Sequence, residues 1–516
     1  TDLDSADKTY TEALVIEEDV TIYATAELEG YETSETAEFA YTVKQGAKSK
    51  EAALATTLSD GNIVALYYEN NGTGSVLSQT ASGKKLKGVS ATAADGALAI
   101  PEDTAELTVS VDENGYYTFV SGDKYLTSGA TGSSVTFADA AGDYSLWKLQ
   151  KANENGGYYG WLSYDLKLDR NAGKGCILNS RITWFFANAY TLLKDKSLLK
   201  EAEHAYTFMR DKCMDREHGG IFWSVTYDGK PLDTTKHTYN QAFAIYALSS
   251  YYEAAGDEEA LKLAYDLYHV IETKCRDKEG YLEAFTRDFK PASNEKLSEN
   301  GVMAGRTMNT LLHVFEAYTE FYRVSHDEEV GERLKWIMDV FADKVYNPKL
   351  KRQEVFFDKN YNTIIDLYSY GHDIETAWLM DRGVEVLGDD HYKEKMSPIT
   401  ETLAENVYEV AFDGHSLANE CCKGEVNDHR IWWVQAETVI GFLNEYQKHP
   451  QKTKFLEASE AEWEFIKEHV IDKRTGSEWF WEVHPDGSPI ADRPIVEPWK
   501  CPYHNGRMCM EVIRRL

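Results

Sequence analysis

The sequence predicts a multidomain protein in which N-terminal all-β modules precede an all-α (α/α)6 barrel. Three observations lead to this prediction. The chain has 516 residues, which is too long for a single hydrophobic core and indicates two or three domains. Its N-terminal part alternates apolar and polar side chains, as strands do. The remainder repeats pairs of helical segments at intervals of about sixty residues.

Residues 1–46 form the first predicted module, a small β-sandwich. The segment VTIYATAELEGYETSETAEFAYTV has the two-residue period of strands, and it resembles the fibronectin-like modules attached to bacterial carbohydrate enzymes. Residues 47–150 form a second predicted β-domain. In it, NIVALYYE and LTVSVDENGYYTFVSGDKYLTSG have the composition of strands, and Asn-Gly and Ser-Gly dipeptides supply the turns.

Residues 151–516 contain the helical repeat. Aromatic, glycine-bearing stretches begin near residues 157, 219, 280, 354, 416 and 477. Between them lie paired segments with helical periodicity: 179–195 with 198–215, 240–257 with 258–275, 306–325 with 328–346, 372–388 with 392–411, and 429–448 with 453–472. A pair of helices with a hairpin cannot bury its apolar faces alone, so we expect six such units to stack into a closed ring.

The last helical segment, from Asn505, has no complete outer partner. Six pairs require twelve helices, and the sequence shows eleven. The missing helix would precede Gly156, where the sequence offers only DYSLWKLQKANENGG. We therefore expect a barrel with a shortened or missing first helix.

The charge of the chain narrows the class of partner. A formal net charge of −32 repels phosphate backbones and anionic lipids, so we expect neither nucleic acid nor a membrane as a partner. Hydrophobic content of 43% and aromatic content of 13% are typical of a globular protein with aromatic surfaces. The expected ligand is neutral or cationic.

The cysteines bear on the cellular location. The seven cysteines include no Cys-x-x-Cys pair, and an odd number of thiols without metal-type spacing indicates reduced cysteines. The opening residues TDLDSADKTYTEALV also lack the basic and apolar regions of a signal peptide. Both observations favour the cytoplasm for the helical part, whereas the β-modules keep a secreted or cell-surface location open.

The candidate site residues are those that begin the inner helices. All 14 histidines follow residue 203, so imidazole chemistry belongs to the helical part. In the predicted repeat the inner helices all start at one mouth, and there the sequence places Arg181, His237, Tyr239, Asn240, Asn309, His313, His372, Glu375, Trp378, Trp433, Glu437, Trp499, Tyr503 and His504. The pairs His372/Glu375 and Trp433/Glu437 each share one helical face.

These residue types predict proton transfer on a sugar. The positive field at a helix N-terminus disfavours imidazolium, so His372 and His504 are predicted to be neutral bases. A base can remove the proton beside an opened aldehyde, a cation such as Arg181 can stabilise the enediolate, and tryptophan faces can stack on the sugar ring. Epimerisation or isomerisation at C2 follows as the expected reaction.

Other interpretations stay open for the same residues. A single histidine at a helix start is often a cap, a tryptophan pair is often packing, and Glu375 and Glu437 could be hydrogen-bonded supports. They could also be the two opposed carboxylates of a glycoside hydrolase. The H-x-x-E spacing of His313/Glu316 and of His372/Glu375 lacks further ligands, so we expect no metal and no other cofactor. A non-catalytic glycan-binding surface protein with a damaged barrel is the remaining alternative.

Several motifs from about Asn155 to Leu516 resemble the N-acylglucosamine 2-epimerase superfamily and, within it, the cellobiose 2-epimerase family. They are KGCILNSRITWFF, KHTYNQAFAIYALS, YGHDIETAWLMDR, RIWWVQAE and WKCPYHNGRMCMEVI, in the family's order. The resemblance implies an (α/α)6 barrel that reversibly converts the reducing-end glucose of β-1,4-linked disaccharides to mannose. Typical substrates are cellobiose and lactose, and no metal or nucleotide is needed.

The resemblance also implies roles for individual residues. His372 and His504 match the family's acid/base pair; we expect His504 to take the C2 proton and His372 to serve ring opening and reprotonation. Arg181 and His313 match residues that hold the enediolate oxygens. The essential carboxylates correspond to Glu375 and Glu437, and the substrate contacts correspond to Tyr239, Asn309, Trp378, Trp433 and Trp499.

The chain departs from the family pattern at its N-terminus. Family members start with a complete first helix and carry no β-modules. The β-modules suggest glycan contact as an additional partner interaction, and we expect a monomer. The preferred disaccharide does not follow from the motifs.

Overall fold

A computed structural model of the chain forms two compact units, Thr1–Glu154 and Asn155–Leu516. The structure describes residues 21–25, 37–40, 51–53, 58–70, 73–82, 85–91, 93–94, 97–112, 116–128, 135–150 and 156–516. Among these residues, no helix combines the length and the hydrophobicity of a membrane span.

The N-terminal unit is built from antiparallel strands. They are β1 (Thr21–Thr25), β2 (Ala37–Ala40), β3 (Glu51–Ala53), β4 (Ile63–Val64), β5 (Tyr67–Asn70), β6 (Thr73–Ser82), β7 (Lys85–Ser90), β8 (Ala93–Ala94), β9 (Ala97–Ala99), β10 (Leu107–Val111), β11 (Tyr117–Ser121), β12 (Lys124–Ser128), β13 (Val135–Ala138) and β14 (Lys148–Gln150). The sheets have the orders β14-β1-β2, β3-β9-β8, β5-β6-β7 and β13-β12-β11-β10-β4. Strands are confirmed where the structure describes this unit; within the predicted module 1–46 it describes residues 21–25 and 37–40, and the rest of that module lies outside the described residues.

Alternation of side chains explains the five-stranded sheet. In β10, Leu107 and Val109 are buried whereas Thr108 and Ser110 face solvent, as the two-residue period of a strand requires. In the three-stranded sheet β1 pairs with both β2 and β14, with Tyr23 opposite Gln150. This ladder joins segments on either side of residue 46, and the division of the unit into two modules stays a prediction.

The C-terminal unit is helical. Its helices are α1 (Cys176–Leu193), α2 (Lys196–Phe208), α3 (Thr238–Ala255), α4 (Glu258–Val270), α5 (Met308–Ser325), α6 (Glu328–Val340), α7 (Tyr370–Leu387), α8 (Asp390–Ala411), α9 (Trp432–Lys448), α10 (Lys454–Phe465) and α11 (His504–Arg515). Helices α2, α4, α6 and α10 each continue into a π-helical turn of five residues. The predicted helical repeat is confirmed, with boundaries shifted by a few residues.

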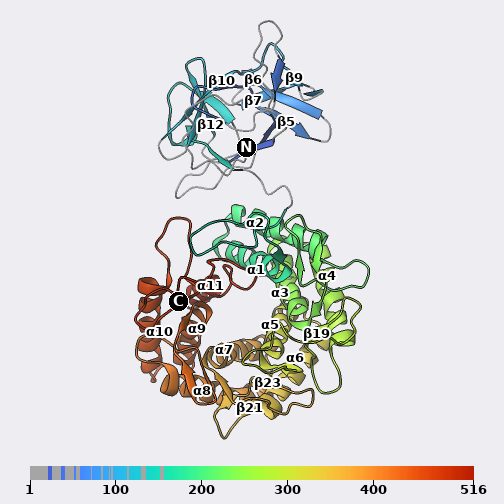
Figure 1. Cartoon of the computed structure of the whole chain (residues 1–516), viewed down its shortest axis with the longest axis vertical. Helices are drawn as coiled ribbons and strands as arrows, with labels where there is room; N and C mark the ends of the chain where they lie inside the picture. The colour runs from blue at the N-terminus through green and yellow to red at the C-terminus, as the bar shows by residue number, and fades with distance from the viewer. Residues whose placement is uncertain are drawn as a thin grey trace. The chain divides into compact units, whose positions relative to one another are not determined.

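The odd-numbered helices form an inner ring and the even-numbered helices lie outside it (Figure 1). Helices α1, α3, α5, α7, α9 and α11 contact one another in that order, and α11 meets α1 to close the ring. Helix α3 buries most of its residues, whereas α4 buries only the stripe Ala260, Leu263, Ala264, Leu267 and Tyr268. Helices buried on both sides are apolar all round, and surface helices carry a single apolar stripe.

Tight turns join each of the first four inner helices to its outer partner. A residue in the left-handed conformation ends the inner helix, and an aspartate caps the next one by accepting a backbone N–H bond: Lys194 with Asp195, Gly256 with Asp257, His326 with Asp327, and Gly388 with Asp389. Such a residue satisfies the last carbonyls, and an Asp N-cap satisfies the first amides of the following helix. The turn chemistry therefore repeats with the helices.

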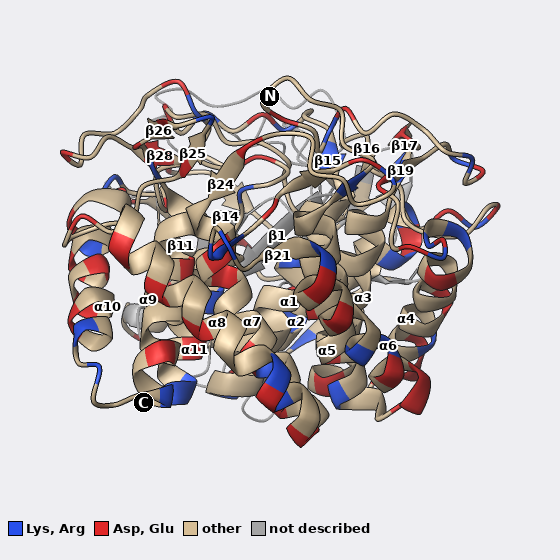
Figure 2. Ribbon diagram, turned by 90° about the horizontal axis from the view of Figure 1, so that it is seen from below, with Lys and Arg blue, Asp and Glu red and all other residues tan. Residues whose placement is uncertain are grey.

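Short strands and hairpins gather at the opposite end of the helices (Figure 2). They are β15 (Lys174–Gly175), β16 (Ser224–Val225), β17 (Pro231–Asp233), β18 (Lys236–His237), β19 (Ala284–Phe285), β20 (Arg306–Thr307), β21 (Tyr346–Asn347), β22 (Arg352–Gln353), β23 (Phe356–Phe357), β24 (Leu367–Ser369), β25 (Glu420–Cys422), β26 (Glu425–Asn427), β27 (Arg430–Ile431) and β28 (Glu482–Val483). Strands β15, β18, β20, β24 and β27 each lead directly into an inner helix and pair with the next hairpin. This pairing fixes where five inner helices begin.

Helix α11 lacks an outer partner among the described residues. Helices α2, α4, α6, α8 and α10 pack on α1, α3, α5, α7 and α9 respectively. Residues 156–175, which precede α1, contain no helix. On the outward side of α11, Cys509 and Ile513 are exposed. Residues 151–155, in the segment where the sequence places the missing helix, lie outside the described residues, so a shortened or missing first helix stays a prediction.

Glycine allows two inner helices to approach closely. A Cβ atom added to Gly441 on α9 would lie 2.4 Å from Cγ1 of Ile374 on α7 and 3.0 Å from its carbonyl oxygen. The backbone oxygen cannot move as a flexible side chain can, so α7 and α9 would have to separate.

We expect Gly441→Ala to lower the thermal unfolding midpoint by a few degrees. Overpacking costs about 1–3 kcal/mol, which exceeds the gain of about 1 kcal/mol in helix propensity. Circular dichroism on heating measures the effect. Glu460→Ala, at an exposed position on α10, is the control and should leave the midpoint nearly unchanged. An unfolding midpoint for Gly441→Ala at or above that of the parent protein would contradict the packing argument.

Candidate active site

The first two turns of the inner helices bring the predicted site residues together inside the ring. Arg181 comes from α1, Tyr239 from α3, His313 from α5, His372 and Glu375 from α7, Trp433 and Glu437 from α9, and His504 from α11. Apart from His372 and Trp433, which are partly exposed, these side chains are buried. Because the helices form a ring, residues more than three hundred positions apart in the sequence, such as Arg181 and His504, lie in one site.

His504 is held by a carboxylate. Its Nδ1 lies 2.8 Å from Oε1 of Glu437, whose other oxygen accepts a bond of 2.9 Å from the indole N–H of Trp378. An ionised Glu437 carboxylate can only accept here, which places the His504 proton on Nδ1 and leaves Nε2 with a lone pair. Burial, followed by the charges of Arg507 and Arg181, lowers the pKa of His504 well below its ordinary value. The ring is neutral at neutral pH.

His313 has a similar support. Its Nδ1 lies 2.7 Å from Oε2 of Glu316, one helical turn further along α5. The other oxygen of Glu316 accepts a 2.8 Å bond from the hydroxyl of Tyr503. Burial opposes ionisation of Glu316, but Arg507 and His313 outweigh it and lower the pKa of Glu316 to about 2. A charged carboxylate therefore orients the His313 ring.

His372 and His504 share one aromatic neighbour. The ring of Trp433 lies 4.7 Å from that of His372 and 5.7 Å from that of His504, centre to centre. Gly371 makes this contact possible, because an added Cβ would lie 2.7 Å from Cη2 of Trp433. Nδ1 of His372 lies 2.7 Å from Oγ of Ser369. The two histidines thus face one site across a tryptophan.

Arg181 lies on the opposite side of this site from α7. One terminal nitrogen donates to the Trp499 carbonyl at 2.5 Å, and the other donates to the Tyr239 hydroxyl at 3.0 Å. Tyr239 in turn packs edge-on against His313, at 5.0 Å between ring centres. The guanidinium of Arg181 also lies 4.4 Å from the centre of the Phe243 ring. A cation is therefore fixed beside the histidines.

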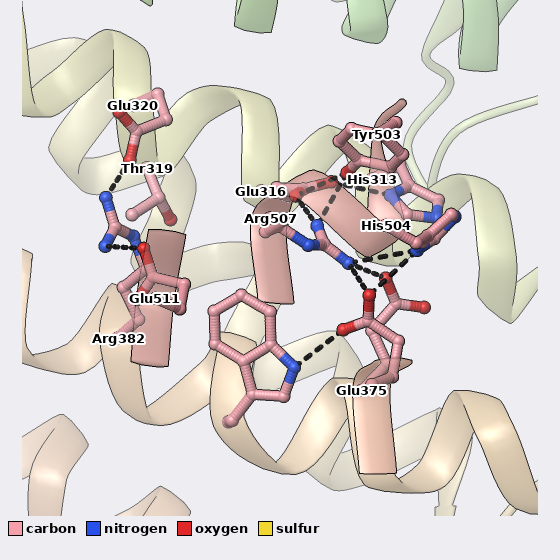
Figure 3. Close-up of polar contacts among 12 residues, drawn as sticks. His313, Glu316, Thr319, Glu320, Glu375, Arg382, Tyr503, His504, Arg507 and Glu511 are labelled. Atoms are coloured by element: carbon pink, nitrogen blue, oxygen red, sulfur yellow. Dashed lines mark hydrogen bonds and ion pairs between the residues drawn. The ribbon is translucent and has the colours of Figure 1, made fainter. Parts of the chain in front are cut away.

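Arg507 connects the carboxylates of three helices (Figure 3). Nη1 binds Oε1 of Glu316, and Nη2 lies 2.5 Å from Oε1 of Glu375 and 2.7 Å from Oε1 of Glu437. The side chain of Arg507 is 1% exposed. Burial and the neighbouring Glu437 raise the pKa of Glu375 to about 7, and burial raises the pKa of Glu437.

In the same cluster, three side chains place ligand atoms close enough together to hold a metal ion. The ligand atoms of Glu375, Glu437 and His504 lie within 4.8 Å of one another. Nη2 of Arg507, however, contacts both carboxylates and lies 3.4 Å from Nδ1 of His504. A guanidinium nitrogen already provides the positive charge at this point, so the donor set does not fit a metal ion.

The geometry also bears on the hydrolase alternative. A glycosidase places its two carboxyl groups on either side of the scissile bond, with sugar between them. Here Glu375 and Glu437 bind the same nitrogen of Arg507. The space between the two carboxylates is filled by a side chain of the protein, and this arrangement does not suit hydrolysis.

The remaining predicted contacts take different positions. Trp499 packs near Tyr239 and Trp223, with 5.7 Å and 5.2 Å between ring centres. Asn309 is half-buried, and its Oδ1 has no hydrogen-bond partner among the described residues. Trp378 is 1% exposed and lies behind the Glu437 carboxylate that it binds. Substrate contact by these three residues stays a prediction.

Sequence reasoning missed Arg507 and Ser369 and gave Glu316 no role. Arg507 follows His504 by three residues, so the helical period alone could have placed both on one face. Glu316 stands in the H-x-x-E spacing with His313, and in the structure the two side chains are joined by a hydrogen bond. Ser369 gives no signal in the sequence, because a serine before a helix is usually its cap.

Comparison with known proteins decides the family. The profile of the family described as N-acylglucosamine 2-epimerase (GlcNAc 2-epimerase) matches residues 157–505, which is more than half of the chain. The chain belongs to this family. The resemblance drawn from the motifs is confirmed, and with it the interpretation of the protein as a carbohydrate epimerase, an isomerase.

Relatives within the family are close. Over 370 residues the chain is 52% identical to a cellobiose 2-epimerase of Ruminococcus albus, a match that covers 72% of this chain and 95% of that protein. A crystal structure of a sugar epimerase from a ruminal bacterium is 51% identical, with a TM-score of 0.70, and covers 71% of this chain and 94% of that one. The structure of cellobiose 2-epimerase from Bacillus thermoamylovorans is 45% identical to this chain, with a TM-score of 0.68. The match covers 71% of this chain and 94% of that one.

We expect stability to fall with pH below about 6.5, in part because of His372. Burial lowers the pKa of this histidine to about 3. The unfolded state therefore binds the proton first as pH falls, and stability is lost progressively between the two pKa values. Urea unfolding measures the free energy of unfolding at about pH 7.5 and about pH 5.5. The decrease between these two pH values should be smaller by about 1 kcal/mol in His372→Gln than in the parent protein. An identical pH dependence in the parent and the variant would contradict the assignment.

Proposed function

We propose that the protein reversibly epimerises C2 of the reducing-end glucose of β-1,4-linked disaccharides, converting cellobiose to glucosyl-mannose and lactose to epilactose. The observation that carries the proposal is the placement of two neutral histidines, His372 and His504, against one tryptophan. The names of the relatives point to cellobiose as a substrate.

His504 is the proposed base. Its Nδ1 proton is bound to Glu437, so Nε2 can accept the proton from C2 of the open-chain aldose. The electron pair of the C2–H bond then moves into a C1–C2 double bond, and the C1 carbonyl oxygen takes the negative charge. The resulting cis-enediolate carries the same number of electrons as the substrate, so no redox partner is needed.

His372 is the proposed acid. If Oγ of Ser369 donates to its Nδ1, the His372 proton lies on Nε2 and can be given to C2 from the other face. A turn about the C2–C3 bond presents that face. Proton removal on one side and return on the other inverts C2, and the reverse reaction exchanges the two roles. His372 would also assist the opening of the sugar ring.

Arg181 and His313 are proposed to stabilise the enediolate. Arg181 is fixed by Trp499 and Tyr239, and His313 is fixed by Glu316, so neither must reorganise when the charge develops. Glu375 and Glu437 are the carboxylates that support the histidine side of the site. Trp433 and Trp499 offer faces for the two sugar rings, with Tyr239, Asn309 and Trp378 as further predicted contacts.

The finer description of the fold belongs to the same proposal. We propose that the ring formed by the eleven α-helices of residues 156–516 is an (α/α)6 barrel with a shortened or missing first helix, and that it works as a monomer without metal or cofactor. The division of the N-terminal unit at residue 46, its contact with glycans, and a cytoplasmic or exported location also stay proposals.

The reaction predicts deuterium incorporation at C2. Incubation of cellobiose in heavy water should yield labelled glucosyl-mannose and labelled cellobiose, measured by NMR and mass spectrometry. His504→Gln should lower kcat by about 10²–10⁴-fold, the usual contribution of a general base, while the protein stays folded. His415→Gln, at an exposed loop position, is the control. Release of free glucose would support hydrolysis instead, and binding without label would support a non-catalytic protein.

A further inference from the structure

Arg507 is a buried cation beside His504 and the carboxylates of the site, and the proton-transfer scheme gives it no role. Its side chain is 1% exposed, and it lies one helical turn after His504 on α11. The planar guanidinium lies 5.0 Å from the centre of the Trp378 ring and 4.7 Å from that of Tyr503. Contact with these two rings limits how far the group can turn.

The two terminal nitrogens of Arg507 serve two different histidines. Nη1 binds Glu316 and lies 2.6 Å from the hydroxyl of Tyr503, and Glu316 holds Nδ1 of His313 at 2.7 Å. Nη2 binds Glu437 at 2.7 Å, and Glu437 holds Nδ1 of His504 at 2.8 Å. A rigid fork of donors can bind carboxylates at both of its ends, which a single ammonium group cannot do.

We propose that Arg507 is a positioning residue for the epimerisation, because it binds the carboxylates that orient His313 and His504 and so fixes which ring nitrogens face the sugar. This inference rests on the function proposed above. Glu375, the third carboxylate on the guanidinium, adds a link to the helix that carries His372.

The physical reason lies in the tautomer of His504. The guanidinium favours the ionised form of Glu437, and an ionised carboxylate can only accept from Nδ1. Without the guanidinium, three carboxylates would face one another in a buried space and would take up protons. A protonated Glu437 could donate to Nδ1, and the proton of His504 would then sit on Nε2. The base would have become an acid.

Arg507 is the cation that binds the Glu437 carboxylate. Helices α5, α7, α9 and α11 and the residue before α11 supply the titratable groups bonded to Arg507 or to its carboxylate partners: Glu316, His313, Glu375, Glu437, His504 and Tyr503. Tyr239 and Tyr246 of α3 also lie within electrostatic reach of Arg507. Arg181 on α1 binds Trp499 and Tyr239, and no hydrogen bond or ion pair joins it to Glu437 in the described part of the chain.

Arg507→Lys tests the inference, with Arg382→Lys as a matched control. Arg382 also joins two carboxylates, Glu320 and Glu511, away from the histidines (Figure 3). We expect Arg507→Lys to lower kcat per folded molecule by about 10–100-fold and to change KM by less than about threefold. The acid limb of the pH profile of kcat should move to higher pH by up to about one unit, because a weaker cation bond raises the pKa of Glu437. Arg382→Lys should affect stability only.

Several outcomes would overturn the inference. One is an unchanged pH profile and kcat in folded Arg507→Lys while the parent enzyme is active. If Arg507→Lys does not fold, nitrogen-15 NMR of histidine-labelled parent protein decides, with the His504 signal assigned through His504→Gln. A proton on Nδ1 supports the inference, and a proton on Nε2 overturns it. A parent protein that epimerises no disaccharide would show that the proposed function itself fails, and the tautomer measurement would still stand.

Discussion

One guanidinium inside the ring forms ion pairs with three carboxylates of the site. Arg507, on the last helix, bonds to carboxylates from α5, α7 and α9. Taking these charges out of water is unfavourable in itself, and a buried network of this kind is tolerated only when its members are paired. The network therefore adds little to stability and instead specifies position. The apolar contacts between neighbouring inner helices must supply the stability that allows it.

The ring converts sequence distance into chemical proximity. Arg181 and His504 are separated by most of the helical unit, yet both lie beside Tyr503: the guanidinium of Arg181 is 4.7 Å from its ring centre and the imidazole 4.5 Å. Short strands that pair with the next hairpin set the start of five inner helices, and the first two turns of these helices carry reactive side chains. Burial lowers the pKa of His372 and of His504, and this is why a strongly acidic protein can keep two neutral imidazoles in one place.

The repeat pattern and the helix starts were enough to predict most of this arrangement. The period of aromatic, glycine-bearing stretches located the hairpins, and the helical period located the helices to within a few residues. Convergence of His372 and His504 on one site followed from the ring alone. The contacts among side chains did not follow. That Arg507 would point inward, and that Trp378 would stand behind Glu437 with 1% exposure, depends on packing between helices far apart in the chain, which no local pattern records.

The two rims of the ring differ in the structures that they carry. Hairpins and helix starts, which hold the reactive groups, occupy one rim, and the glycine–aspartate turns such as Gly256–Asp257 and Gly388–Asp389 occupy the other. Those turns stabilise helix ends by local bonds and contribute nothing to the imidazoles. Circular permutation, peptide tags or attachment to a solid support can therefore be directed to the distal turns, where the backbone can be opened without disturbing the histidine end.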